Sequence, residues 1–344
     1  MGHHQINIGK HVGFPACFFF GGISMCSCFS PLLKAIDAYL AKADGDLKDE
    51  LDAAGFAETD DTMEAIRALE DEVAAALVEE TELFTAAAGK AVDLQTFANE
   101  IWPGVKLNDE LAKKLTGIFK NRLTEIMPGL VEAYLKRTDK QLALNQVSKI
   151  TTGWIEEWSG QLAELMQLNS QTEIEKILEA GLANGDGIAT FTQNILDSGI
   201  RDEYYKARRV SVTEVLRAHN VAQQEAFMQS PSVTQKMWKH TGGYRIAPRE
   251  NHVAMDGQTV GKADRFTLQG IDGSTYFPLY PVDPCLPAAE SINCHCICEP
   301  VVDPDILGMS LEERQALQQQ AVDEMDDDWE RELDAQNRAR AGIE

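Results

Sequence analysis

Histidine and cysteine, the side chains that most often hold metal ions or act as nucleophiles, are concentrated late in this chain. Four of the seven His and four of the seven Cys lie between His219 and Cys298. Gly and Pro gather in the same block, from Trp238 to Pro300. This composition predicts a small irregular domain, and we expect the specific chemistry or recognition of the protein to lie there.

Zinc is the metal that these cysteines favour. The run Asn-Cys-His-Cys-Ile-Cys occupies residues 293–298, and another cysteine lies upstream. Thiolates and imidazoles are the usual zinc ligands, so the chain could close a tetrahedral site, if it folds back on itself, with His252, Cys285, Cys294 and Cys296. The spacing differs from that of a common zinc finger, because no second Cys-x-x-Cys pair accompanies it. A core of buried thiols, or disulfide formation outside the cell, is the alternative. Beyond this candidate zinc ion we expect no cofactor.

His252 and Asp256 stand four residues apart, just before a turn at Gly257. They could form a metal pair, or a histidine oriented by a carboxylate. Together with Cys285, Cys294 and Cys296 they would then serve a metal-assisted hydrolase or nuclease. We favour the alternative, in which the two side chains bond each other and stabilise the turn. The sequence contains no phosphate-binding loop, nucleophile elbow, zinc-protease or dinucleotide motif, so we do not expect an enzyme.

A long helix is predicted over residues 201–229, and polar side chains gather near its middle. Glu214, Arg217 and His219 cluster there, and Asn220 follows. One interpretation is a polar constellation that faces the block at 238–300. The spacing alone favours a solvated helix face with an ordinary Glu–Arg pair, which is worth only a few tenths of a kcal/mol.

Charge and cysteine count narrow the class of protein. The net charge of −24 argues against non-specific binding to nucleic acid, because phosphate binding needs clustered Lys and Arg. Seven cysteines are not the even framework of a small secreted domain, so we expect a reducing compartment. The apolar run at 13–29 is too short and too rich in Gly to span a membrane. It predicts an arm that packs on a partner or on the body of the protein, or a poorly ordered terminus.

Hydrophobic periodicity predicts a mainly α-helical protein with a small α+β module. Helices are expected at Thr62–Thr81 and 201–229, and breaks at Pro103, Pro128 and Ser198-Gly199. Strands are expected at 233–240 and 265–268, and the acidic stretch 309–338 reads as a helix. The domains are therefore predicted as an apolar N-terminal arm, a helical domain, the α+β module and an acidic helical tail, over residues 1–29, 30–169, 170–303 and 304–344.

The order of motifs over residues 170–303 resembles the phage Mu F-like head morphogenesis domain, found in minor head proteins of tailed bacteriophages and prophages. That family has Ala-Arg and Thr-Glu on a helix, then Asn, Trp, Arg-x-x-His-x-x-x-Asp-Gly, Phe, a Pro-Asp-Pro region and Asn-Cys-x-Cys before a Pro. The matching residues are Ala207, Arg208, Thr213, Glu214, Asn220, Trp238, Arg249, His252, Asp256, Gly257, Phe266, Pro281, Asp283, Pro284, Asn293, Cys294, Cys296 and Pro300. His295 and Cys298 are not part of this pattern.

The resemblance implies a structural role in the virion head, assembled in the host bacterial cytoplasm. The expected partners are the portal protein and other head proteins, with possible contact with packaged DNA during packaging or ejection and no membrane association. The functional core would consist of Thr213, Glu214, Asn220, Trp238, Arg249, His252, Asp256, Gly257, Asn293, Cys294 and Cys296. Some relatives carry a C-terminal toxin, but the segment after Pro300 is too short for a catalytic domain.

Overall fold

The computed structural model describes residues 29–241 and 248–342. Apart from Phe29, the predicted apolar arm lies outside the described residues, as do three of the seven cysteines. The fold class predicted from the sequence is confirmed: a mainly helical body carries a small module that contains the sheet. None of the described helices is both long enough and apolar enough to cross a bilayer.

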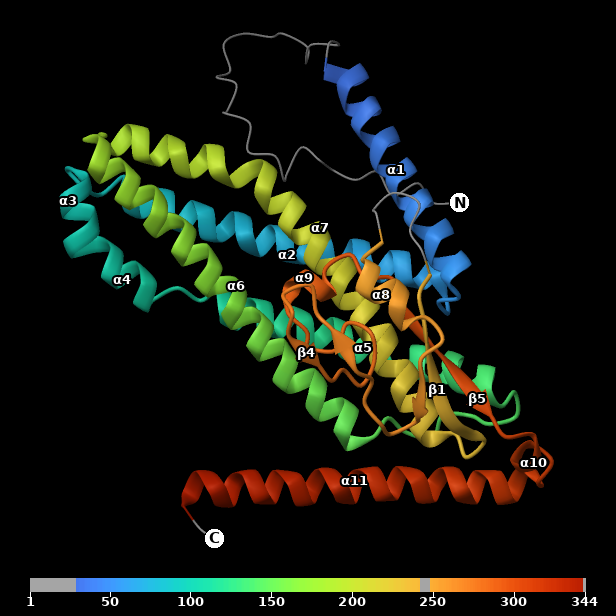
Figure 1. Cartoon of the computed structure of the whole chain (residues 1–344). Helices are drawn as coiled ribbons and strands as arrows, with labels where there is room; N and C mark the ends of the chain where they lie inside the picture. The colour runs from blue at the N-terminus through green and yellow to red at the C-terminus, as the bar shows by residue number, and fades with distance from the viewer. Residues whose placement is uncertain (1–28, 242–247, 343–344) are drawn as a thin grey trace.

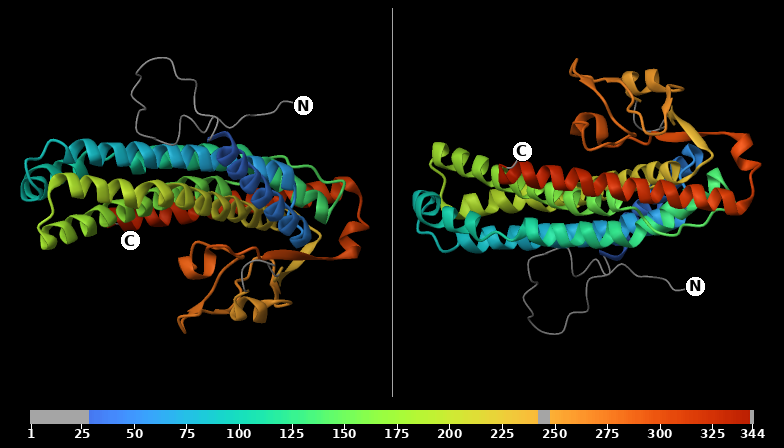
Figure 2. Two further views of the ribbon diagram at one scale, coloured as in Figure 1. Left: turned by 90° about the horizontal axis from the view of Figure 1, so that it is seen from above. Right: turned by 90° about the horizontal axis from the view of Figure 1, so that it is seen from below.

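Long helices form the body of the molecule. Figures 1 and 2 show them as one elongated bundle, with the module on one side of it and the last helix running along it. The helices of the bundle are α1 (Phe29–Ala54), α2 (Thr59–Ala88), α5 (Leu111–Thr138), α6 (Lys149–Asn184) and α7 (Ile188–Gln229). At one end of the bundle α2 is joined to α5 through α3 (Leu94–Thr96), the π-helical turn η2 (Phe97–Ile101) and α4 (Trp102–Leu107).

The bundle forms because each helix has an apolar stripe. On α2, for example, Met63, Ile66 and Val73 recur at helical spacing and are fully buried, as the sequence predicts. They pack in one core with Leu115 and Phe119 of α5. Burial of such side chains stabilises the fold by about 1.5–3 kcal/mol each.

The module is built on a three-stranded antiparallel sheet. Its central strand is β1 (Val233–Lys239), which pairs with β2 (Thr259–Gly261) on one side and β5 (Ile297–Val302) on the other. The other elements are the short helices α8 (Glu250–Met255) and α9 (Ala288–Ser291) and the hairpin of β3 (Leu268–Gln269) and β4 (Thr275–Tyr276). The predicted strand at 233–240 is confirmed, whereas at 265–268 only Leu268 enters a ladder.

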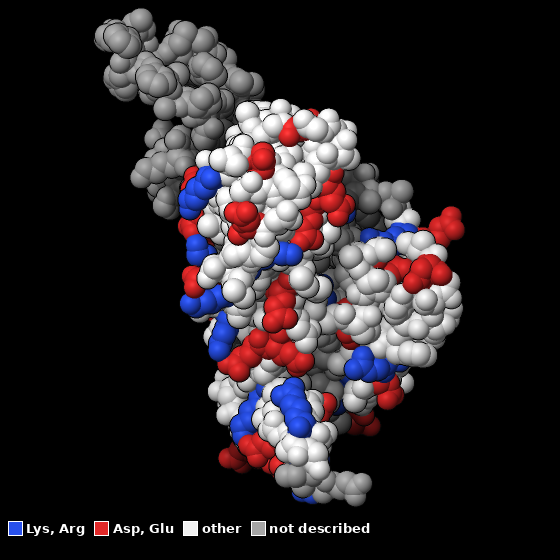
Figure 3. Space-filling model, turned by 90° about the vertical axis from the view of Figure 1, so that its left-hand side faces the viewer, with Lys and Arg blue, Asp and Glu red and all other residues white. Residues whose placement is uncertain are grey.

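After the sheet the chain forms α10 (Pro304–Leu307) and then α11 (Leu311–Ala341). The predicted helix at 309–338 is confirmed, and it begins with a capping box between Ser310 and Glu313. In the view of Figure 3, Asp and Glu side chains form a band down the middle of one face, and Lys and Arg gather along its edge.

Two predicted breaks are absent. Helix α7 runs without interruption through Ser198-Gly199, and α5 continues through Pro128. Met127 and Val131 on either side of Pro128 are buried in the core. Tertiary packing therefore outweighs the local cost of Gly or Pro in a helix, about 1 and 3 kcal/mol respectively.

The predicted boundary between residues 169 and 170 lies inside α6. One hydrophobic core also joins the two sides of it: Leu130 of α5 and Phe227 of α7 belong to the same buried cluster as Trp238 and Phe266 of the module. The module and the helical body therefore do not have separate cores.

Candidate functional site

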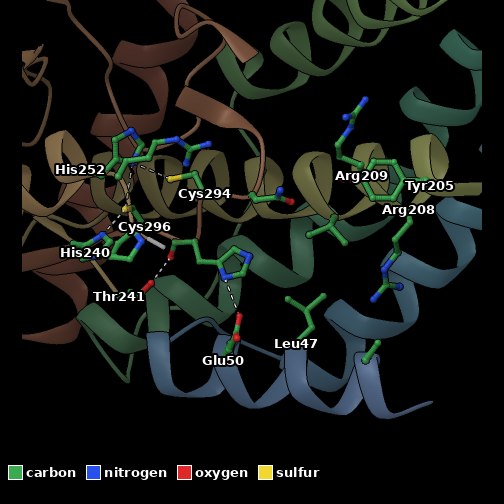
Figure 4. Close-up of a pocket in the computed structure, with 16 residues that line it drawn as sticks. Leu47, Glu50, Tyr205, Arg208, Arg209, His240, Thr241, His252, Cys294 and Cys296 are labelled. Atoms are coloured by element: carbon green, nitrogen blue, oxygen red, sulfur yellow. Dashed lines mark hydrogen bonds and ion pairs between the residues drawn. The ribbon is translucent and has the colours of Figure 1, made fainter. Parts of the chain in front are cut away.

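A buried cluster of one histidine and two cysteines lies where the module faces the bundle (Figure 4). His252, Cys294 and Cys296 each place one potential ligand atom within 4.8 Å of the others, and all three are buried. The Nδ1 atom of His252 lies 3.5 Å from Cys294 Sγ and 3.7 Å from Cys296 Sγ. These three residues were predicted as metal ligands, and the fold brings them together.

The local backbone conformation directs the side chains of both cysteines toward His252. Cys294 and Cys296 lie in the loop between α9 and β5, and His252 lies on α8. Asn293 has a φ of 57°, a left-handed conformation that Asn tolerates better than most residues. It turns the chain just before Cys294. Residues two apart in an extended segment share a face, which places both thiols on the same side.

A buried carboxylate contacts the ring nitrogen of His252 that faces away from the cysteines and orients the ring. The Nε2 atom of His252 lies 2.9 Å from Glu290 Oε2, and both side chains are almost fully buried. Glu290 also accepts hydrogen bonds from the backbone N–H of Ile271 (2.7 Å) and from the Asn251 side-chain amide (3.1 Å). A carboxylate held in this way fixes the Nε2–H tautomer of the imidazole. The lone pair of Nδ1 then faces the two sulfur atoms.

The two thiols differ in acidity. Hydrogen bonding from Cys296, supported by the hydrogen bond and charge of His252, holds the pKa of Cys294 well below its usual value despite burial. The hydrogen bond to Cys294 and burial raise the pKa of Cys296 well above its usual value. Burial opposes protonation of His252, but the hydrogen bond and charge of Cys294 outweigh it and raise the pKa of His252. Cys294 is therefore the first thiol of the pair to ionise.

His240 is a neighbour of the cluster that the sequence prediction missed. Its Nδ1 atom lies 3.5 Å from Cys296 Sγ, and its backbone N–H donates to Asp256 Oδ1 at 2.8 Å. The residue follows β1 directly, and Figure 4 shows its ring beside Cys296. Its histidine type was the only signal in the sequence, because its distance from the cysteines along the chain suggested no link.

Two other predicted groups are placed elsewhere. Cys285 is exposed and lies outside the cluster. Asp256 does not pair with His252, because His252 bonds Glu290 instead. The expected His252–Asp256 contact is therefore wrong, although Asp256 does stabilise its turn through the backbone of His240.

The cluster opens onto a cavity of about 330 Å³ between the module, α1 and α7. Figure 4 shows Leu47 and Glu50 of α1 and Tyr205, Arg208 and Arg209 of α7 on the sides away from the cysteines. His295 also borders the cavity, and its Nδ1 atom lies 3.5 Å from Glu50 Oε2. The helical body and the module thus both contribute to the surroundings of the cluster.

A second group of buried polar residues anchors the module to α7. Arg217 donates through Nε to Glu214 Oε2 at 2.9 Å and through Nη1 to the backbone oxygen of Val282 in the module. The indole of Trp158 donates to the same Glu214 oxygen at 2.6 Å and lies under the Arg217 guanidinium. Glu214 and Arg217 are nearly fully buried, so the interpretation as a solvated helix face is wrong.

The remaining predicted residues have structural contacts. Asn220 donates to the backbone oxygens of Leu216 (3.0 Å) and Cys296 (3.5 Å), and Thr213 donates to Arg209 O within α7. Trp238 is fully buried and packs edge-on against His252 and Phe266.

Two more predicted residues support the loops around the cluster. Arg249 donates to Ile292 O at 2.6 Å, next to the cysteine turn. Gly257 has a φ of 80° and donates to Trp238 O, a conformation that strongly favours Gly. Both residues therefore hold the backbone from which His252 and the two cysteines project.

Comparison with known proteins covers the part of the chain that contains these residues. The family model described as Phage Mu protein F like protein matches residues 172–299. A Bacillus subtilis (strain 168) protein named uncharacterized protein YqbB is 34% identical over 218 residues, which make up 63% of this chain and 70% of that protein. No solved structure matches significantly. On the strength of the family match and of this relative, the chain belongs to the Phage Mu protein F like family.

Proposed function

We propose that this protein is a minor head protein of a tailed bacteriophage or prophage, and that it binds the portal protein while the procapsid assembles. The observation that carries the proposal is the family match over residues 172–299, since this phage family points to a protein of the head. Binding to the portal and a part in DNA packaging are the finer steps of the proposal.

The burial of several residues of the family motif supports a structural role. Glu214, Asn220 and Trp238 are buried. Glu214 accepts from Arg217, which also donates to Val282 O of the module, and Asn220 donates to Cys296 O, so these contacts hold the module against α7. These motif residues act on the fold of the chain itself, as expected of a scaffold that presents surfaces to other proteins.

Exposed apolar side chains on the module offer a surface for such a contact. Val253 on α8, Ile271 in the β3–β4 turn and Phe277 after β4 are each roughly half exposed. Apolar anchors that protrude from a rigid element are typical of the centre of protein interfaces. Leu165 and Leu168 on α6 are comparably exposed and serve as a matched control.

The placement of Asp256 gives no support to the hydrolase or nuclease. That mechanism requires Asp256 to act beside His252, but the carboxylate is exposed and bonds the backbone of His240. His252 is instead bonded to Glu290, whose carboxylate also accepts from the backbone N–H of Ile271.

The test is co-purification of the tagged full chain from cells that express the neighbouring phage head genes, with mass spectrometry of what is recovered. We expect the portal protein, and we expect the double variant Ile271→Asp, Phe277→Asp to reduce its recovery by at least about 10-fold, since a central anchor is worth about 2 kcal/mol. The double variant Leu165→Asp, Leu168→Asp should leave recovery unchanged. Recovery of the wild-type chain without portal would overturn the proposal.

A further inference from the structure

We propose that the protein binds one Zn²⁺ through Cys294 Sγ, Cys296 Sγ, His252 Nδ1 and His240 Nδ1, as a structural site that fastens the module together. The inference is independent of the partner of the protein in the phage head. It rests on the geometry of the buried cluster, on the carboxylate behind His252 and on the position of His240.

The spacing of the ligand atoms fits a tetrahedral zinc site. With Zn–S near 2.3 Å and Zn–N near 2.0 Å, a sulfur and a nitrogen ligand at the tetrahedral angle are about 3.6 Å apart. The distances from His252 Nδ1 to the two sulfur atoms are 3.5 and 3.7 Å, and His240 Nδ1 lies 3.5 Å from Cys296 Sγ. The distances from His252 to both sulfur atoms therefore agree with a shared central ion, and the third distance places His240 beside Cys296.

The surroundings of His252 are those of a metal ligand. Histidines that bind zinc usually donate their other N–H to a carboxylate, which orients the ring and strengthens the ligand. Glu290 has this position, 2.9 Å from His252 Nε2, and is itself held by Asn251 and by the backbone of Ile271. A core of thiols alone would not require this buried carboxylate.

His240 is the best-placed fourth ligand among the residues that border the cavity. It contacts Cys296 but lies outside the set of three residues that are mutually within 4.8 Å, so ligation requires its side chain to rotate toward Cys294. Its backbone is already fixed by Asp256. The other histidine at the cavity, His295, instead faces Glu50.

The ligand types select zinc and a closed site. Thiolates and imidazoles bind Zn²⁺, whereas Mg²⁺ and Ca²⁺ prefer oxygen ligands. Four protein ligands leave no open position for a catalytic water, which is the arrangement of structural zinc sites. The ion would join the end of β1, helix α8 and the loop before β5.

The first experiment measures the metal content of the purified full-length chain by mass spectrometry, followed by titration against a zinc chelator. We expect one zinc per chain in the wild type, and loss of zinc in Cys294→Ser and His252→Ala. The control Cys285→Ser, at the exposed cysteine outside the cluster, should keep its zinc. A wild-type chain that neither purifies with zinc nor takes it up in the titration would overturn the proposal.

Glu290→Gln tests the site without removing a ligand. Loss of an outer-sphere carboxylate lowers metal affinity by about 10–100-fold, so the chelator titration should shift by that amount while circular dichroism stays unchanged. This variant keeps the proposal testable if Cys294→Ser fails to fold. An unchanged affinity would mean that His252 is not a ligand.

X-ray absorption of the zinc-loaded chain identifies the ligands themselves. We expect two sulfur and two imidazole neighbours, and His240→Ala should reduce the imidazoles to one. A wild-type spectrum with a single imidazole, or one unchanged in His240→Ala, would overturn the assignment of His240. A spectrum without sulfur would overturn the site.

Discussion

At the scale of single residues, buried polar side chains hold the centre of the molecule together. His219 on α7 lies 2.8 Å from Thr62 Oγ1 and 2.9 Å from the Tyr134 hydroxyl, and so links α2 and α5. The Thr62 hydroxyl donates to Glu58 O, which leaves it to accept from His219 Nε2–H. The Tyr134 hydroxyl then donates to Nδ1. This network requires a neutral imidazole.

The neutrality of His219 makes stability depend on pH. Burial, assisted by the charge of Arg137, lowers the pKa of His219 from 6.5 to about 3. Below pH 6.5 His219 binds a proton in the unfolded chain but not in the folded chain. The free energy of unfolding therefore falls as pH falls. Between about pH 7 and about pH 5 this residue should lower the free energy of unfolding by about 2 kcal/mol.

Urea denaturation across this pH range checks the prediction. His219→Gln keeps two polar atoms but does not titrate, so its stability should fall less steeply than that of the wild type, by about 2 kcal/mol over the same interval. The wild type and the variant share all other titrating groups, so the contributions of those groups cancel when the two slopes of stability against pH are compared. Parallel curves would show that His219 is protonated in the folded chain or is exposed.

At the scale of elements, α11 is a docked helix rather than a free acidic tail. Arg314 donates to Asp139 Oδ2 at 2.7 Å, and both side chains are almost fully buried. Gln318 donates to Ala143 O at 3.0 Å. Farther along, Trp329 packs over Gly153 of α6 so closely that a Cβ there would clash with the indole. The helix is therefore fastened at its start and near its middle.

We predict that Arg314→Ala releases α11. The variant leaves the Asp139 carboxylate buried without its partner, which costs about 3–5 kcal/mol unless the helix detaches and lets water in. Hydrogen exchange should accelerate by about 100-fold or more across Leu311–Ala341, with little change in α2.

Arg331→Ala is the matched control on the same helix. Arg331 pairs with Asp328 on the surface, and exposed ion pairs are worth about 0–1 kcal/mol. Exchange across α11 should therefore stay close to that of the wild type. Protection of α11 that survives Arg314→Ala would place the docking energy elsewhere, for example at Trp329.

At the scale of the whole molecule, the module and the bundle share one core. Trp238 and Phe266 of the module belong to the same buried cluster as Leu130 and Tyr134 of α5. Arg217 adds a hydrogen bond from α7 to the module. Such a shared core predicts that the two parts unfold together.

A fragment of residues 170–303, the module as the sequence delimits it, should therefore fail to fold cooperatively. It lacks α5 and much of α6, so the apolar face of α7 would be uncovered. Calorimetry of the full chain should show one main transition, and the fragment should show none. A sharp transition in the fragment, with dispersed amide resonances, would demonstrate that the module is self-sufficient.

The sequence by itself determined the features that depend on residue type and local period. Apolar residues at helical spacing predicted α2 and the helix that became α11, and β-forming residues before a turn predicted β1. Histidine and cysteine are the usual zinc ligands, so His252, Cys294 and Cys296 could be singled out as candidate ligands before any fold was known, together with Cys285, which the fold places outside the cluster. The order of the motif identified the family.

Only the tertiary structure decided which polar residues meet. Glu290 is one of 55 acidic residues, and nothing local marks it as the partner of His252. His240 reaches Cys296 only because β1 pairs with β5. Glu214 and Arg217 have the spacing of a surface pair, and the module that covers them is folded from residues far along the chain. Hydrophobic periodicity describes a single helix and the local cost of residues such as Gly and Pro within it. Long-range packing determines which residues cover that helix and whether it continues through a Gly or Pro.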